Sequence, residues 1–340
     1  MSEPRSARAA PLLRVDDRGL FCPAGGFHVD PWKPVERAVI SHGHGDHARW
    51  GSQAYLSAAP GMPILRRRLG EGAAIEAVPF GERVRIGEVS VSFHPAGHIL
   101  GSAQVRVERG GEVWVFSGDY KRQPDATCES FEVVPCHTFI TEATFALPIY
   151  RWDDTRQVAR EILAWWDANR EADRASVLFC YSLGKAQRIL GELARLTDRQ
   201  VFVHGAVEPL NECYRAAGIE MLPTRTVSET GRGQSFAGEL VLAPPSAGGS
   251  TWMRRFGAAG TGFASGWMRV RGTRRRRGFD RGFTLSDHAD WPDLLRTVEE
   301  TGAERVLTTH GYAEPLARFL RERGLSAGTL ATPFEGEEAE

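Results

Sequence analysis

Residues 41–50 read SHGHGDHARW and directly follow the apolar segment Ala38-Val39-Ile40. Four residues of metal-ligand type fall within six positions of this stretch, namely His42, His44, Asp46 and His47. Imidazole nitrogens and carboxylate oxygens suit zinc and similar divalent ions, and glycines between them let a loop bend tightly. A chance cluster of this density in a polar surface loop is hard to obtain. The stretch therefore predicts a metal site at the end of a strand.

Two later segments offer further ligands of the same kind. In FHPAGHILGS, residues 93–102, His98 follows an alternating strand and is flanked by glycines that permit close backbone approach. His94 is a weaker candidate, since it ends the strand itself. In VWVFSGDYKR, residues 113–122, Asp119 emerges after four strand residues, where a carboxylate is costly to bury without a cation or a partner. We expect His98 and Asp119 to lie beside the loop of residues 41–50 and to contribute to the same metal site.

Composition sets the broad class. The 340 residues are 42% hydrophobic and 25% charged, which suits one large or two medium globular domains. Five cysteines form no C-x-x-C pair, so free thiols in a reducing compartment are expected. No signal peptide opens the chain, and no apolar run approaches the roughly 20 residues of a membrane span. We expect a cytoplasmic protein without membrane contact, and the net charge of −1 says nothing about partners.

The order of elements favours α/β architecture. Residues 84–119 alternate as a β-meander with a turn at Gly110-Gly111, and strands dominate the first third of the chain. After Tyr150 the pattern changes, because Asp153 or Asp154 can cap a long helix and two strand–loop–helix units follow. The last segment predicts a strand at 282–285, a helix at 291–301, a strand at 306–309 and a helix around 316–320.

Three motifs lie outside the first metal segments. TEATF places Glu142 after a strand, TLSDHADW places His288 late in the chain, and VLTTHG places His310 after it. In the middle of the chain, LGKAQ covers residues 183–187; it lacks the upstream glycine and the Ser/Thr of a nucleotide-binding P-loop, so nucleotide hydrolysis is not expected.

The order H-x-H-x-D-H, G-H-x-L-G, S-G-D resembles that of the metallo-β-lactamase superfamily. The resemblance implies an α/β fold of the αββα sandwich type and two divalent metal ions, zinc first with manganese as the alternative. It implies that His42, His44, His98 and Asp119 hold one ion, and that Asp46, His47 and the bridging Asp119 hold the other with His310.

The later motifs resemble motifs A, B and C of the β-CASP nucleases, carried by Glu142, His288 and His310. The implied organisation is a core at residues 1–150 and 271–340, interrupted by a β-CASP α/β domain at 151–270. The implied activity is hydrolysis of phosphodiester bonds, with Asp46, Glu142 and His288 as catalytic residues. In the relatives, LGKAQ belongs to the inserted domain.

Among these nucleases the chain most resembles short bacterial ligase-associated DNA exonucleases. The implied partners are nucleic acid, DNA ahead of RNA, and a DNA ligase or helicase. His310 is more typical of RNA-cutting members, and Asp287 departs from both common patterns. An RNA 3′-end processing nuclease therefore stays open, as do a small-molecule metallo-hydrolase and a non-catalytic nucleic-acid scaffold.

Basic residues suggest where a nucleic acid would be held. RGTRRRRGFDRG, which contains Arg271, Arg274 and Arg275, is the densest basic run of the chain. Lys185 opens a predicted helix, whose N-terminus could hold a backbone phosphate. A solvated hairpin tip and an ordinary strand–helix turn are the simpler interpretations of these two features.

Overall fold

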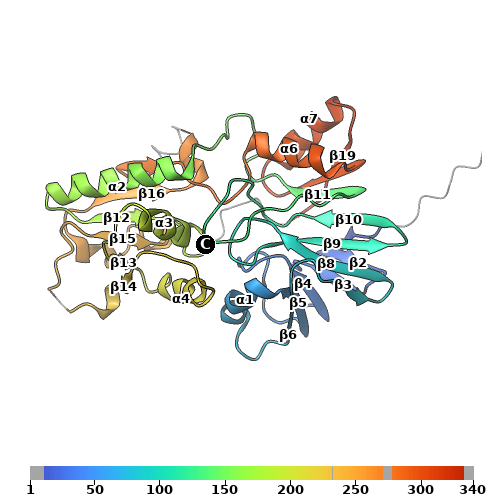
Figure 1. Cartoon of the computed structure of the whole chain (residues 1–340), viewed down its shortest axis with the longest axis horizontal. Coiled ribbons are helices and arrows are strands. Elements are labelled where there is room, and N and C mark those ends of the chain that lie inside the picture. The colour runs from blue at the N-terminus through green and yellow to red at the C-terminus, as the bar shows by residue number, and fades with distance from the viewer. Residues whose placement is uncertain (1–10, 232, 271–277, 333–340) are drawn as a thin grey trace, which may run out of the picture.

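The computed structural model describes residues 11–231, 233–270 and 278–332. Two lobes lie side by side (Figure 1). One is built from the first part of the chain together with its last helices and strands, and the other from the middle part. The chain crosses into the second lobe after strand β11, Thr138–Glu142, and returns after strand β17, Arg281–Phe283.

Two sheets form the first lobe. The first runs in the order β1-β2-β3-β4-β5-β6, and the second in the order β19-β18-β11-β10-β9-β8-β7. The strands of the first sheet are β1 Arg14–Val15, β2 Leu20–Cys22, β3 Phe27–Val29, β4 Arg37–Ile40, β5 Ala54–Ala58 and β6 Ile75–Val78. Those of the second, besides β11, are β7 Val84–Ile86, β8 Val89–Pro95, β9 Ala103–Arg109, β10 Glu112–Phe116, β18 Arg305–Thr309 and β19 Ser326–Thr329. The expected meander is confirmed, because β7 to β10 pair antiparallel in sequence order.

Apolar side chains set the layers of this lobe. Val39 and Leu56 of the first sheet pack with Val91 and Val105 of the second in one buried cluster. Helix α1, Met62–Leu69, covers the outer face of the first sheet, and helices α6, Trp291–Thr301, and α7, Ala313–Glu322, cover the second. The lobe therefore has four layers, helix, sheet, sheet and helix, and the helix expected at 291–301 is confirmed.

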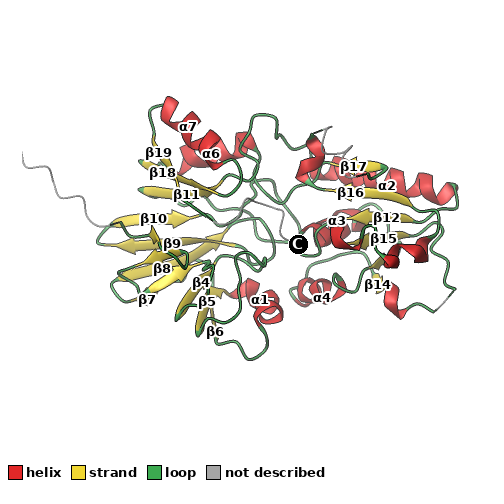
Figure 2. Ribbon diagram, turned by 180° about the vertical axis from the view of Figure 1, so that it is seen from behind, coloured by secondary structure: helices red, strands yellow, loops and turns green. Residues whose placement is uncertain are grey.

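The second lobe is a parallel sheet in the order β14-β13-β15-β12-β16-β17. Its other strands are β12 Ser176–Phe179, β13 Val201–Val203, β14 Thr224–Thr226, β15 Leu240–Ala243 and β16 Gly260–Ala264. Helices α2, Thr155–Glu171, and α3, Lys185–Ala194, cover one face, and α4, Glu208–Ala216, follows β13 (Figure 2). Short 3₁₀ turns that include Phe256 and Met268 cover the other face. Because β17 pairs with β16, this sheet extends past the boundary at residue 270 that the sequence suggested.

Local sequence explains where α2 begins. The Asp154 carboxylate accepts hydrogen bonds from the backbone N–H groups of Arg156 and Gln157, which satisfies donors that a helix start leaves open. Val158, Ile162 and Trp166 then recur on one face and are buried against the sheet. The helix expected from this capping and spacing is confirmed.

An apolar seam joins the lobes. Ile64 of α1 and Ile99 of the loop after β8 pack with Leu183, which precedes α3, and with Tyr214 of α4. The Tyr214 hydroxyl accepts a hydrogen bond from the Leu100 backbone N–H at 3.2 Å. The two lobes thus meet through buried side chains beside the loops that carry the histidines.

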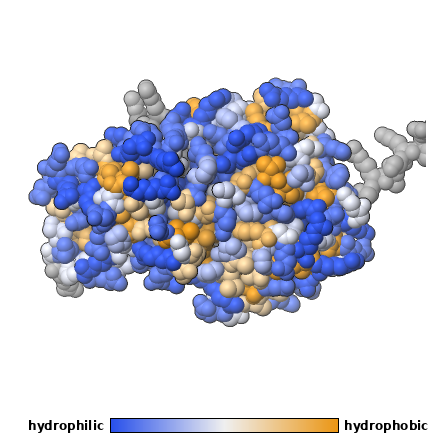
Figure 3. Space-filling view, viewed as in Figure 1, coloured by the Kyte–Doolittle hydropathy of each residue, from blue (hydrophilic) through white to orange (hydrophobic). Residues whose placement is uncertain are grey.

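Among the described residues, every helix is too short or too polar to cross a bilayer. On the face drawn in Figure 3, hydrophilic side chains dominate and the hydrophobic ones form small separate patches.

Candidate metal centre

Strand direction brings the predicted ligands to one edge of the first lobe. Strands β10, β11 and β18 are parallel neighbours, and β8 runs the same way because two antiparallel pairings separate it from β10. Their carboxyl ends therefore lie at the same edge. Loops from this edge carry His98, Asp119 and His310, while Glu142 ends β11 itself.

Two glycines let these loops come close to one another. Gly118 has a φ of 55°, and a Cβ there would lie 2.9 Å from the Ser41 Cβ, so the turn before Asp119 sits against the loop after β4. A Cβ on Gly311 would lie 2.5 Å from the Thr144 Cα, so the turn after His310 sits against the loop after Glu142. Larger residues at either position would push the ligand loops apart.

Three histidines and one aspartate form the first group. His42, His44, His98 and Asp119 each offer a ligand atom, and these atoms lie within 4.8 Å of one another. The His44 Nδ1 is 3.1 Å from the His42 Nε2 and 3.0 Å from the His98 Nε2. The Asp119 Oδ2 is 3.5 Å from the His42 Nε2.

The outer nitrogen of each ring fixes its tautomer. The His44 Nε2 faces the Leu183 carbonyl at 3.3 Å, and the His98 Nδ1 faces the Asp287 carbonyl at 2.8 Å, so both nitrogens must donate. The Ser41 hydroxyl donates to Asp30 and therefore accepts from the His42 Nδ1 at 3.0 Å. In neutral rings this leaves the His42 Nε2, His44 Nδ1 and His98 Nε2 without protons.

This arrangement fits a cation. Three unprotonated nitrogens that face one another repel unless a positive charge stands between them. Ligand nitrogens around a tetrahedral zinc ion, bound at about 2.0–2.1 Å, lie roughly 3.3 Å apart, which is close to the observed spacing. Outer hydrogen bonds of this kind orient the ligands of metal sites. The first group can therefore hold a divalent ion with His42, His44, His98 and Asp119 as its ligands.

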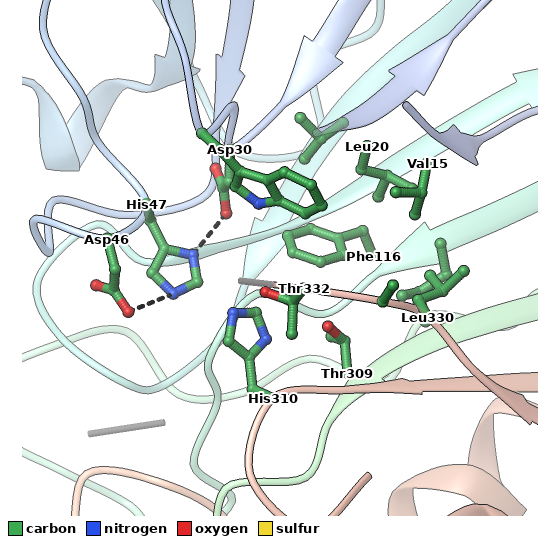
Figure 4. Close-up of a pocket in the computed structure, with 14 residues that line it drawn as sticks. Val15, Leu20, Asp30, Asp46, His47, Phe116, Thr309, His310, Leu330 and Thr332 are labelled. Carbon is green, nitrogen blue, oxygen red and sulfur yellow. Dashed lines mark hydrogen bonds and ion pairs between the residues drawn. The ribbon is translucent and has the colours of Figure 1, made fainter. Parts of the chain in front are cut away.

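The second group surrounds His47 (Figure 4). The His47 Nε2 lies 3.4 Å from the Asp119 Oδ2 and 3.6 Å from the Asp46 Oδ2, and the ring of His310 stacks on that of His47 with 5.5 Å between centroids. Asp119 thus faces both groups through one oxygen. His310 has a φ of 60°, a left-handed conformation that turns the chain beyond β18 at this point. Two carboxylates and two imidazoles suit a second divalent ion.

Asp30 orients the second group, and the sequence analysis missed it. Its carboxylate accepts from the His47 Nδ1 at 2.7 Å and from the Ser41 backbone N–H at 2.7 Å. It lies just after β3, twelve residues before the histidine loop begins at His42. An aspartate before proline reads as an ordinary strand end in the sequence, and only the pairing of β3 with β4 brings it under the loop.

Glu142 and His288 form a third group with Asp119. The His288 Nδ1 lies 2.8 Å from one Glu142 oxygen and 3.1 Å from the other, and the Tyr120 backbone N–H donates to Glu142 at 2.8 Å. The pair is 146 residues apart in sequence and buried. The His288 ring also packs 4.7 Å from that of His98, so this pair lies beside the first metal group.

Burial and charge separate the two metal groups. Burial lowers the pKa values of His42 and His98 well below the usual range, and nearby imidazoles, His47 beside His42 and His288 beside His98, add to the shift. Burial acts in the same direction on His47, but the carboxylates of Asp119 and Asp46 outweigh it and raise the pKa of His47 well above the usual range. His42 and His98 of the first group therefore favour the neutral form, whereas His47 of the second favours the charged form.

Of the basic residues expected to hold nucleic acid, only Lys185 lies among the described residues. Lys185 is fully buried, with its ammonium 3.5 Å from an Asp287 carboxylate oxygen, so it does not fit a phosphate contact on the surface. Arg271, Arg274 and Arg275 lie outside the described residues. His94, the weaker ligand candidate, points to Glu132 at 3.0 Å and takes no part in the metal groups.

A groove along the seam passes beside the loop that carries His44. Arg67 and Arg68 of α1 border it from the first lobe, and the chain after β12, β13 and β15 borders it from the second. Gly43 and Leu183 also line it, and both neighbour His44, Gly43 in sequence and Leu183 through its carbonyl. Both arginines are exposed, so the groove offers positive charge beside the loop that carries His44.

Sequence comparison finds relatives that are much longer than this chain. The chain is 35% identical over 315 residues to a protein named "Probable DNA ligase" from Opitutus terrae, which covers 92% of this chain and 30% of that protein. It is 28% identical over 169 residues to "Endoribonuclease YSH1" from Gibberella zeae, covering 48% of this chain and 19% of that protein. It is also 28% identical over 136 residues to "Integrator complex subunit 11" from Danio rerio, covering 38% and 22%. The chain thus spans less than a third of each.

Structural comparison supports the fold alone. A crystal structure of a protein of unknown function from Enterococcus faecalis superposes with a TM-score of 0.57 at 12% sequence identity, over 88% of this chain and 80% of that one. No protein-family model matches the chain. The similarities, together with the buried His/Asp groups, are consistent with a metal-dependent hydrolase related to nucleases.

Proposed function

We propose that this chain is a two-metal phosphodiesterase of the metallo-β-lactamase/β-CASP type that cuts nucleic acid. The observation that carries the proposal is Asp119, whose Oδ2 lies 3.5 Å from the His42 Nε2 and 3.4 Å from the His47 Nε2. One carboxylate between two histidine groups is the arrangement that a pair of bridged ions requires. Two divalent ions bound there would lower the pKa of a water and offset the charge of an in-line displacement at phosphorus.

The protein groups have separate roles in this reaction. Asp46 orients the attacking water from the side of His47. His288 donates a proton to the leaving oxygen, and Glu142, which accepts from the His288 Nδ1, fixes its tautomer. The four-layer lobe supplies these residues, and the parallel-sheet lobe, as the inserted β-CASP domain, closes the seam over them.

We propose DNA as the substrate and exonucleolytic removal of nucleotides as the reaction, in repair with a ligase. Support comes from the relative named as a DNA ligase, whose similarity extends over 92% of this chain. The relatives named as endoribonucleases cover half of the chain or less, which favours RNA less strongly. The seam groove, with Arg67 and Arg68 at its border, would guide the strand by its phosphates.

The test is digestion of end-labelled polynucleotides. Single- and double-stranded DNA and RNA, each with 5′-phosphate and 5′-hydroxyl ends, are incubated with the protein and Zn²⁺ or Mn²⁺. We expect stepwise shortening of DNA that chelator abolishes. Cleavage of RNA alone would replace the DNA assignment by the RNA one, and hydrolysis of thioesters or lactams without polynucleotide cleavage would overturn the nuclease proposal. His94→Ala, which changes a histidine outside the metal groups, serves as the matched control.

A further inference from the structure

Charged side chains are buried where the inserted lobe meets the loop that carries His288. Lys185 and Arg188 of α3 are both nearly inaccessible, as is Asp287, which precedes His288. The Asp287 carboxylate lies 3.1 Å from the Arg188 Nε and 3.5 Å from the Lys185 Nζ. Arg188 also pairs with Asp125 at 2.6 Å. Buried charges are tolerated only when they are paired in this way, so the cluster holds its members in fixed positions.

The same loop holds a metal ligand through its backbone. The Asp287 carbonyl accepts from the His98 Nδ1 at 2.8 Å, and the neighbouring Ser286 carbonyl accepts from the Lys121 ammonium at 2.5 Å and from Arg188 at 3.3 Å. Arg188 further donates to the His98 carbonyl at 3.4 Å. The position of the Asp287 backbone, and with it the tautomer of His98, therefore depends on cations that α3 supplies.

The start of α3 supports a second ligand directly. The Leu183 carbonyl accepts from the His44 Nε2. Gly184 follows with a φ of 85°, and a Cβ there would lie 2.4 Å from an Ile99 methyl carbon and 3.6 Å from an Asp287 oxygen, so only glycine lets the helix approach this closely. One turn of the inserted lobe, residues 183–188, thus touches the outer nitrogen of His44 and, through Asp287, that of His98.

We propose that Asp287 is a positioning residue which, held by Lys185 and Arg188, fixes the tautomer of His98 and makes ion binding at the first metal group depend on docking of the inserted lobe. The inference rests on the metal centre of the proposed function. It also accounts for the LGKAQ segment, whose lysine is buried at this contact rather than exposed to a substrate.

The experiment measures the apo and zinc-loaded protein without any substrate. In Asp287→Asn the carboxylate charge is lost at constant shape, and we expect zinc affinity at the first group to fall by about 10–100-fold, as for other outer partners of metal ligands. In ¹⁵N spectra of the metal-free protein, the His98 ring should change from a single Nδ1–H tautomer to a mixture. A merely structural role would leave that tautomer signal unchanged.

Three further variants keep the test decisive. Lys185→Met/Asp287→Asn removes both members of the pair and leaves Arg188 paired with Asp125, so it decides the matter where the single variant does not fold. Glu208→Gln, which breaks the ion pair with Arg215 in the same lobe, controls for general loss of stability. Asp287→Glu, which keeps the charge, should restore part of the zinc affinity.

The outcomes separate this inference from the proposed function. Wild-type zinc affinity and an unchanged His98 tautomer in the folded Asp287 variants overturn the role of Asp287 while the nuclease proposal stands. A wild-type protein that binds no zinc overturns the metal centre itself. Weakened zinc binding together with the tautomer change supports the positioning role, whichever polymer the protein cuts.

Discussion

The two lobes both turn the carboxyl ends of parallel strands toward the seam, yet they contribute different atoms to it. From the first lobe come imidazole nitrogens and carboxylates, grouped around Asp119. From the inserted lobe come a backbone carbonyl at Leu183 and the buried cations Lys185 and Arg188. The first set can bind ions, whereas the second set can only hold the groups that do.

This difference shows why a metal centre needs more than its ligands. An imidazole presents a lone pair in a defined direction only if its other nitrogen has a fixed partner. His47 finds that partner, Asp30, within its own lobe, while His44 and His98 depend on residues 183 and 287 at the seam. His47 of the second metal group is thus supported from inside the first lobe. In the first metal group, His42 is supported by Ser41 of the same lobe, whereas His44 and His98 have their outer partners at the seam.

The largest expected difference is in the loss of kcat between a histidine variant in the first lobe and one in the inserted lobe. His47→Ala removes a ligand beside Asp119, and we expect kcat to fall by about 10³-fold or more, because several kcal/mol of charge stabilisation depend on the ion and each 1.36 kcal/mol is tenfold in rate. His204→Ala, a histidine that borders the groove from the inserted lobe, should cost far less. Steady-state digestion of labelled DNA measures kcat for both variants. Equal losses would contradict the assignment of the ion-binding side chains to the first lobe.

A smaller loss should follow from a residue that transfers a proton without holding an ion. His288→Ala should lower kcat by about 10²-fold, within the range of general acid catalysis, while the zinc content of the purified protein stays at the wild-type value. Metal analysis beside the kinetic assay checks this. Loss of an ion from the variant would mean that His288 is a ligand.

The two metal groups should differ in how pH affects them. His47 has a raised pKa, so the metal-free protein keeps a proton on its ring to higher pH. An ion that binds there must displace this proton. The affinity of the second group for the ion should therefore rise by about tenfold for each unit of pH until that pKa is passed. His42 and His98 have lowered pKa values and are already neutral, so these two ligands should add no pH dependence to ion binding at the first group. Zinc titration calorimetry between about pH 6 and 8 measures the affinity of each metal group. The same dependence on pH at both groups would contradict the raised pKa of His47 as the cause.

The smallest effect concerns the groove. Arg67→Ala/Arg68→Ala should raise KM several-fold with little change in kcat, and the salt dependence of binding should fall by about one unit of slope for each phosphate that an arginine no longer neutralises. Arg85→Ala, an exposed arginine on β7, is the matched control. A change in kcat without a change in KM would place these arginines at the reacting phosphate instead.

Much of the fold was predictable because it depends on local sequence. The capped helix after Asp154, the meander of β7 to β10 and the helix at 291–301 were each predicted from residues a few positions apart. The ligand residues stood out for a similar reason, since histidines and aspartates crowd the ends of apolar strands. Periodicity and capping act over one or two turns of chain, so no knowledge of distant segments is needed.

Other features depended on contacts that local patterns do not encode. Asp30 reads as an ordinary strand end and Asp287 only as a departure from the family pattern. The pairing of β3 with β4 and the docking of α3 make them partners of His47 and His98. Lys185 was a candidate for holding a phosphate, with an ordinary strand–helix turn as the alternative. In the structure Asp287 pairs with it inside the protein. The sequence determined which residue types end each strand. The outer partners of His44 and His98 were decided by the tertiary structure, because a hydrogen bond such as that between His98 and Asp287, 189 positions apart, exists only once both segments have folded against the seam.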